Sequence, residues 1–96
     1  MQPQRIIVTG GATNIGRAIT EAFLAQGASV AVGQPNPAVA APLVERYGKR
    51  VVALELDLAN AAQCGAFINE AAERLGGVDG LVNNAAVTGP GVTRSL

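Results

Sequence analysis

The chain has 96 residues, with seven basic and seven acidic side chains, one cysteine and no histidine. Its length limits it to a single domain, and its zero net charge gives no indication of binding to nucleic acid or to an anionic membrane. One cysteine rules out an intrachain disulfide, and the absence of histidine removes the commonest metal ligand and general base. No apolar run reaches the ~18 residues that a membrane span needs, so we expect a soluble, cytoplasmic protein without a metal site.

The first part of the chain is predicted to form a strand, a glycine-rich turn and a helix. Residues 5–8 are mostly apolar and β-branched, which is typical of a strand. Residues 15–26 have the spacing of an amphipathic helix, and Gly27 is suited to end it. The apolar face predicted for this helix consists of Ile15, Ala18, Ile19, Ala22 and Phe23.

The turn between this strand and this helix is a candidate anion site. The free N–H groups and the positive dipole end of a helix face whatever lies over such a turn, and a dinucleotide pyrophosphate is a frequent occupant. The alternative is a tight turn that binds no ligand. The sequence is not a P-loop, because Arg17 and Ala18 stand where that motif has lysine and a hydroxyl residue. Without that hydroxyl there is no Mg²⁺ ligand, which argues against nucleoside triphosphate hydrolysis.

Strands and helices are predicted to alternate along the rest of the chain. The expected elements are, in order, a strand at 29–32, a helix at 38–47, a strand at 51–55, a helix at 60–75 and a strand at 80–83. Pro35 and Pro37 predict a loop over 33–37. This alternation indicates βαβ units and therefore an α/β fold, a doubly wound parallel sheet of about four strands and three helices.

The two later helices also have predicted apolar faces. The shorter one is expected to bury Val39, Leu43, Val44 and Tyr47. The longer one is expected to bury Cys64, Phe67, Ile68, Ala71, Ala72 and Leu75. We therefore interpret Cys64 as a small core residue and not as a reactive thiol.

The glycine-rich turn resembles the cofactor loop of the short-chain dehydrogenase/reductase family. It reads Thr9-Gly10, three residues to Asn14, then Gly16, with Asn14 in place of the usual middle glycine. Asparagine tolerates the left-handed region well and is a good helix N-cap, so the exchange is mild. The resemblance covers residues 1–96 and implies the N-terminal NAD(P)-binding part of a Rossmann-like domain, with strand order 3-2-1-4. The loop residues it assigns to the dinucleotide are Gly10, Thr13, Asn14, Ile15 and Gly16.

Two further segments match the same family in the expected order. Asp57-Leu58 follows the third strand, where the resemblance implies contact with the adenine, although an acid before a helix also complements the helix dipole. Asn83, Asn84 and Ala85 follow the fourth strand, where the resemblance implies that Asn83 fixes the turn and Ala85 lies behind the adenine ribose. Two asparagines after a strand are also compatible with an ordinary turn.

The choice between NAD and NADP stays open at the sequence level. A carboxylate at the end of the second strand binds the ribose 2′-hydroxyl and repels a 2′-phosphate. This chain has Gln34 there, followed by Pro35 and Asn36. A basic residue before the middle position of the glycine-rich turn would favour NADP, but position 13 is threonine. Arg17 has the length to reach a phosphate, but a long basic side chain on a helix is equally expected to lie in solvent.

The residues that would carry the reaction of this family are missing. The resemblance implies hydride transfer between nicotinamide and an alcohol or carbonyl, with a Tyr-x-x-x-Lys pair and a serine moving the proton. The single tyrosine and single lysine, Tyr47 and Lys49, are two residues apart and lie near the end of the second predicted helix. We expect no catalytic residue here, and no turnover without the remainder of a full-length parent that would hold the alcohol or ketone.

Three interpretations share these residues. The chain is a truncated member of the family, a non-catalytic NAD(P)-binding module, or a non-functional remnant. In each, the fourth strand would be a sheet edge, which favours self-association and a possible homo-oligomer. Val78, Leu81 and Val82 are expected to be partly exposed there.

Overall fold

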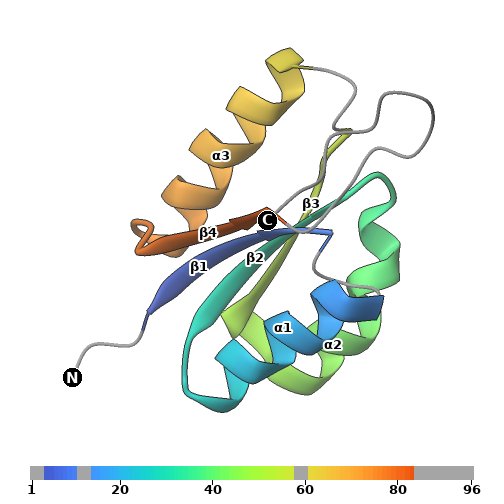
Figure 1. Cartoon of the computed structure of the whole chain (residues 1–96), viewed down its shortest axis with the longest axis vertical. Helices are drawn as coiled ribbons and strands as arrows, with labels where there is room; N and C mark the ends of the chain where they lie inside the picture. Colours follow the sequence, from blue (N-terminus) through green and yellow to red (C-terminus); the bar gives the residue numbers. More distant parts are fainter. Residues whose placement is uncertain (1–3, 11–13, 58–60, 84–96) are drawn as a thin grey trace.

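The computed structural model describes residues 4–10, 14–57 and 61–83. Its elements alternate between strand and helix from the first to the last (Figure 1). In chain order they are β1 (Arg5–Thr9), α1 (Asn14–Ala25), β2 (Ser29–Gln34), η1 (Pro37–Ala40), α2 (Ala41–Tyr47), η2 (Gly48–Arg50), β3 (Val51–Glu55), α3 (Ala61–Leu75) and β4 (Gly80–Asn83).

The strands form one four-stranded parallel sheet in the order β3-β2-β1-β4, which confirms the predicted fold class and strand order. Helices α1 and α2 cover one face of this sheet, and α3 covers the other (Figure 1). Alternate residues of each strand face opposite helices, so the sheet has an apolar core on both sides. The core under α1 and α2 comprises Ile6, Val8, Leu24, Ala28, Val30, Val32, Ala40, Leu43 and Val51. The core under α3 comprises Ile7, Ala31, Val52, Leu54, Leu56, Phe67 and Ala71.

The predicted apolar face of the first helix was correct only in part, because Phe23 packs against the core but Ile15, Ala18 and Ala22 are exposed. Ile15 is 71% exposed, whereas Thr20 and Leu24 are fully buried. Apolar residues occupy most of the circumference of α1, so their spacing identified a helix without fixing its orientation. The buried Gly16 lies on the same side as Thr20, one turn before it.

The predicted loop at 33–37 was also too long. Gly33 and Gln34 belong to β2, because the Gly33 carbonyl accepts from the Gly10 N–H and the Gln34 carbonyl accepts from the Leu56 N–H, each at 2.8 Å. The predicted helix at 38–47 is a 3-10 turn followed by a short α-helix. Pro42, which lacks an N–H, stands in the first turn of α2.

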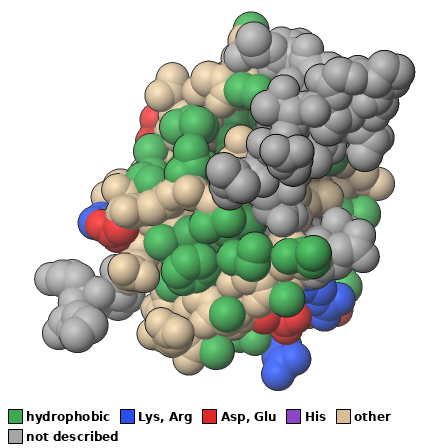
Figure 2. Space-filling model, viewed as in Figure 1, with side chains coloured by type: hydrophobic (Ala, Val, Ile, Leu, Met, Phe, Trp, Pro, Cys, Tyr) green, Lys and Arg blue, Asp and Glu red, His purple; other side chains and the backbone are tan. Residues whose placement is uncertain are grey.

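The faces of the two later helices were predicted in part. On α2, Leu43 is buried but Val44 is 38% exposed. On α3, Phe67 and Ala71 are buried but Ile68 is 39% exposed. The expectation for the fourth strand is confirmed, since Val78 and Leu81 are exposed and Val82 is half-buried. The face of the molecule that Figure 2 draws carries a group of apolar side chains.

The start of β1 is held to the turn before β4 by Arg5 and Asp79. The backbone N–H of Arg5 donates to Asp79 Oδ2 at 2.8 Å, and Arg5 Nε lies 3.2 Å from the same oxygen. The Asp79 N–H donates to the Arg5 carbonyl at 2.7 Å, and Arg5 Nη1 donates to the Gly76 carbonyl at 2.7 Å. Hydrogen bonds from the Arg5 side chain and then its backbone hold the pKa of Asp79 below its ordinary value of 3.8.

Replacing Gly33 by alanine is expected to destabilise the fold by about 1–3 kcal/mol, because overpacking forces neighbours to move. A Cβ at Gly33 would lie 2.7 Å from Phe67 Cζ and 2.9 Å from Leu56 Cδ2. The matched control is Gly65→Ala on α3, where a Cβ meets nothing within 4 Å; there alanine is expected to stabilise by roughly 0.5–1 kcal/mol. Urea denaturation of the parent and both variants measures the free energies of unfolding. A Gly33→Ala variant as stable as the parent would contradict the predicted overpacking.

Asp79→Asn is expected to destabilise the protein near neutral pH but not in acid. A carboxyl whose pKa is depressed by folding stabilises the fold above its unfolded pKa, and this is lost as pH falls through the folded pKa. The difference in unfolding free energy between parent and variant should therefore shrink as pH falls below 3.8. Glu45→Gln, an exposed change on α2, controls for the loss of one charge. A difference that stays constant from about pH 6 to about pH 2 would rule out this linkage.

Candidate functional site

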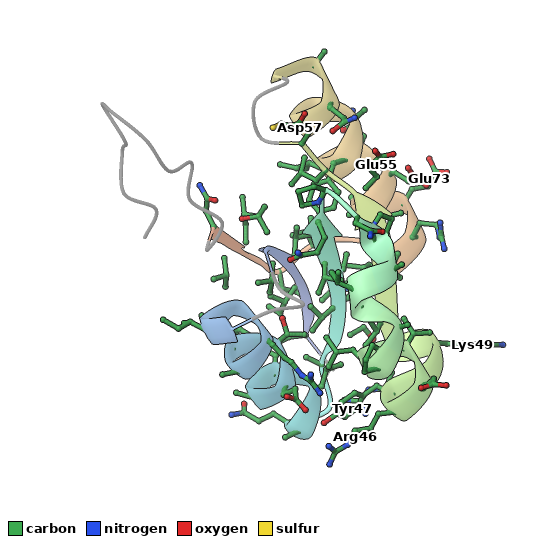
Figure 3. All side chains as sticks on the ribbon, turned by 90° about the vertical axis from the view of Figure 1, so that its right-hand side faces the viewer. Arg46, Tyr47, Lys49, Glu55, Asp57 and Glu73 are labelled. Atoms are coloured by element: carbon green, nitrogen blue, oxygen red, sulfur yellow. The ribbon has the colours of Figure 1, made fainter. Side chains whose placement is uncertain are left out.

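The candidate site lies along the carboxyl edge of the sheet. Because all four strands are parallel, their carboxyl ends lie at one edge, and ligands of open α/β sheets bind in the crevice outside that edge. Thr9, Gln34 and Asn83 are the last residues of their strands, and α1 begins at this edge. Figure 3 shows Asp57 at this end of the molecule and Tyr47 at the other.

Gly10 makes the turn that leaves β1. Its φ is +68°, a left-handed conformation that glycine adopts without strain. Its N–H donates to the Gly33 carbonyl at 2.8 Å, so the turn stays attached to the neighbouring strand. The chain then enters α1 at Asn14. The structure thus supplies a geometric reason for the glycine that opens the predicted cofactor loop.

Thr9 and Asn83 are joined across the strand ends. They are register partners on β1 and β4, and the Thr9 hydroxyl donates to Asn83 Oδ1 at 2.8 Å. Thr9 is 6% exposed, so this bond is shielded from water on one side. It fixes the end of β4 next to the turn at Gly10, although 74 positions separate the two residues.

Asp57 lies two residues beyond the end of β3 and is exposed. Its backbone N–H donates to Oε1 of Gln63, which lies on α3. This contact ties the beginning of α3 to the end of β3. Asp57 thus lies close both to the candidate crevice and to the start of α3, whose dipole its carboxylate complements.

The remaining predicted site residues are distributed as follows. Gln34 is 8% exposed and ends β2. Ile15 is exposed in the first turn of α1, next to the buried Gly16. Arg17 is exposed on α1, with Nε 3.2 Å from Glu21 Oε2, so its side chain lies in solvent along the helix, as one of the two alternatives predicts. Thr13, Leu58, Asn84 and Ala85 lie outside the described residues.

A hollow of about 150 Å³ opens beside this edge, on the α3 side of the sheet. It is lined by Thr9, Leu56, Cys64, Phe67, Ile68, Leu81 and Asn83. Cys64 is half-buried and lines this hollow as well as packing against the core, so its predicted core position is only partly correct. Sequence reasoning missed the hollow, because its lining comes from β1, β4, α3 and the segment after β3, and no local pattern connects them.

Tyr47 and Lys49 lie far from the candidate site. Tyr47 packs against the core under α1 and α2, and the Arg50 guanidinium carbon lies 5.7 Å from its ring centroid. Within the described ranges, no group of three or more metal-ligating side chains is found. No helix in this part of the chain is both long and apolar enough to cross a membrane.

Thr9→Val is expected to cost about 1 kcal/mol, since it removes a buried hydrogen bond and leaves Asn83 Oδ1 without its donor. The control is Thr20→Val, because the Thr20 hydroxyl is fully buried and has no hydrogen-bond partner among the described residues. Removing that hydroxyl should be neutral or stabilising. Denaturant titrations of the two variants give the comparison, and equal losses in both would refute the assigned role of the Thr9–Asn83 bond.

Comparison with known proteins shows which family this chain is similar to. A family model described as short chain dehydrogenase matches residues 4–96. The chain is 41% identical over 86 residues to L-2,3-butanediol dehydrogenase of Corynebacterium glutamicum, which covers 84% of this chain and 33% of that protein. A short-chain dehydrogenase of Streptomyces avermitilis has a similar crystal structure, with a TM-score of 0.85 and 33% identity, covering 91% of this chain and 32% of that one.

A second solved structure is that of 3-ketoacyl-(acyl-carrier-protein) reductase of Brucella melitensis complexed with NADH. It matches with a TM-score of 0.80 and 27% identity, covering 88% of this chain and 35% of that one. The chain thus spans about a third of the length of these relatives. With a family match from residue 4 to residue 96 and the parallel sheet in the order β3-β2-β1-β4, the chain belongs to the short-chain dehydrogenase/reductase family.

Proposed function

We propose that residues 1–96 are the N-terminal NAD(P)-binding part of an oxidoreductase that transfers hydride between nicotinamide and an alcohol or carbonyl. The observation that carries this proposal is the carboxyl edge, where the left-handed Gly10 turn leads from β1 into α1 beside the Thr9–Asn83 bond. A helix start after a glycine turn at a parallel strand end suits a pyrophosphate. Dehydrogenase relatives and a structural neighbour that holds NADH support it.

Each predicted residue has a proposed role at this edge. The pyrophosphate would lie over the turn formed by Gly10, Thr13, Asn14, Ile15 and Gly16. Gln34 would face the adenine ribose, and Asp57 and Leu58 would hold the adenine. Asn83 would fix the turn after β4, and Ala85 would lie behind the adenine ribose. The dinucleotide, when bound, would accept hydride from an alcohol or give it to a carbonyl, while this part of the chain would bind and orient the dinucleotide.

We further propose that this chain alone binds without turnover. Tyr47 and Lys49 lie at the opposite end of the molecule from Asp57 (Figure 3). The 96 residues contain no other tyrosine or lysine, so they lack a Tyr-x-x-x-Lys pair near the nicotinamide. The proton transfer and the alcohol or ketone site would belong to the remainder of a longer protein. The specific substrate, homo-oligomerisation and a cytoplasmic location stay predictions.

Dinucleotide binding is the direct test. A thermal melt with NAD⁺, NADP⁺ and their reduced forms should show a cooperative transition that rises with ligand, by about 2.7 kcal/mol of stabilisation at 100 times the Kd. Asp57→Ala should weaken binding by about 10- to 150-fold, because a hydrogen bond to a charged group contributes roughly 1.5–3 kcal/mol. Glu45→Ala, on exposed α2, is the matched control. A cooperative melt that no dinucleotide shifts would overturn the proposal.

Absence of turnover is tested separately. The 96-residue chain, mixed with NAD⁺ and a panel of secondary alcohols or polyols, should produce no NADH above the uncatalysed rate. Proton transfer by a positioned tyrosine typically contributes 10²–10⁴-fold, and this chain has no such group at the site. Steady NADH formation that depends on protein concentration would contradict this expectation while leaving the binding proposal intact.

A further inference from the structure

We propose that Glu55, on β3, makes this site prefer NAD(H) over NADP(H), although the usual position for that discrimination carries no charge. The inference rests on the proposed dinucleotide function. It concerns the 2′ position of the adenine ribose, where the two cofactors differ by one phosphate. The carboxylate that repels this phosphate would come from β3 and not from β2.

Residue 34 cannot repel a phosphate by charge. In dinucleotide-binding sheets an acid at the end of the second strand binds the ribose 2′-hydroxyl, about 20 residues after the glycine turn. Gln34 occupies that position here, at the end of β2. Its carboxamide can hydrogen-bond to a hydroxyl or to a phosphate, so by itself it separates the two cofactors weakly.

Glu55 stands directly beside Gln34 on the neighbouring strand. The two residues are register partners of β2 and β3, and neighbouring strands lie about 4.8 Å apart. Val30 and Val32 of β2, and Val51 of β3, belong to the core under α1 and α2. Side chains alternate along a strand, so Gln34 and Glu55 both project to that same side. Glu55 is exposed, so its carboxylate lies in solvent at the strand end beside Gln34.

The described cations do not neutralise the negative charge of Glu55. Arg5, Lys49 and Arg50 precede or begin β1 and β3, so they lie at the amino edge of the sheet. Arg46 and Arg74 lie in the last turns of α2 and α3, which also lead to that edge. Figure 3 shows the separation, with Glu55 and Asp57 at one end and Arg46 and Lys49 at the other.

Arg17 is the one described cation near the carboxyl edge, and it is already paired. Its Nε lies 3.2 Å from Glu21 Oε2, and Glu21 Oε1 lies 3.8 Å from Arg46 Nη1. A phosphate monoester carries about −1.5 to −2 charges at pH 7. A 2′-phosphate next to Glu55, with Asp57 two residues further on, would be repelled by the negative charge of these carboxylates. A 2′-hydroxyl, in contrast, would donate a hydrogen bond to a carboxylate.

The experiment compares Kd values of NAD⁺ and NADP⁺ for the 96-residue chain and two variants by calorimetry. The parent should bind NAD⁺ at least about tenfold more tightly, which corresponds to ~1.4 kcal/mol. Glu55→Gln should bring the two Kd values to within about threefold of each other, mainly by tightening NADP⁺. Glu73→Gln makes the same charge change on α3, on the other face of the sheet, and should leave the parental ratio unchanged.

A second measurement needs no variant. Because the discrimination is electrostatic, raising the salt from about 0.05 M to about 0.5 M should reduce the parental preference for NAD⁺. Three results would each overturn this inference and leave the proposed function standing. They are equal Kd values of NAD⁺ and NADP⁺ for the parent, an unchanged ratio of these Kd values in Glu55→Gln, and a ratio that does not change with salt. A folded chain that binds neither dinucleotide would overturn both.

Discussion

The parallel pairing of β1 with β2 on one side and β4 on the other is the constraint on which the rest of the structure depends. Parallel neighbours need a crossover between them, and helices in these crossovers cover both faces of the sheet. The same pairing brings every carboxyl end to one edge. Thr9 and Asn83 therefore meet at 2.8 Å although 74 positions separate them. The position of the candidate site at the carboxyl edge follows from the topology of the sheet.

Two glycines let other parts of the chain lie close to the backbone at the carboxyl edge of the sheet. Gly33 leaves space that the Phe67 ring occupies, so α3 packs tightly against the end of β2. Gly10 turns through the left-handed region and donates to the Gly33 carbonyl, so the turn after β1 and the end of β2 are fixed to each other. A side chain at Gly33 would act on the core and on the site at once, since Leu56 also contacts its missing Cβ position.

Most of the described cations lie toward the amino edge of the sheet. At the amino edge, Arg5 holds Asp79, and Arg50 donates to the carbonyl of Leu24 in the last turn of α1 and to that of Ala28 directly before β2. These cations therefore fix where elements begin and end. At the carboxyl edge the described charges near the strand ends include Glu55 and Asp57. An arrangement of this kind is compatible with a pyrophosphate bound by backbone N–H groups, and it disfavours additional negative charge beside the ribose.

The sequence by itself determined the fold class, because alternating strand and helix patterns indicate parallel βαβ units. Its motifs determined the family, and the strand order came from the resemblance to that family together with topology rules. It located the β4 edge and the candidate residues at the strand ends. It did not determine the rotation of α1, since apolar residues surround that helix and only packing selected Leu24 over Ile15. Tertiary structure alone decided that Gly33 and Gln34 extend β2, because hydrogen bonds from Gly10 and Leu56 come from distant segments. It also decided that Glu55 is the neighbour of Gln34, since strand register is a property of the folded sheet.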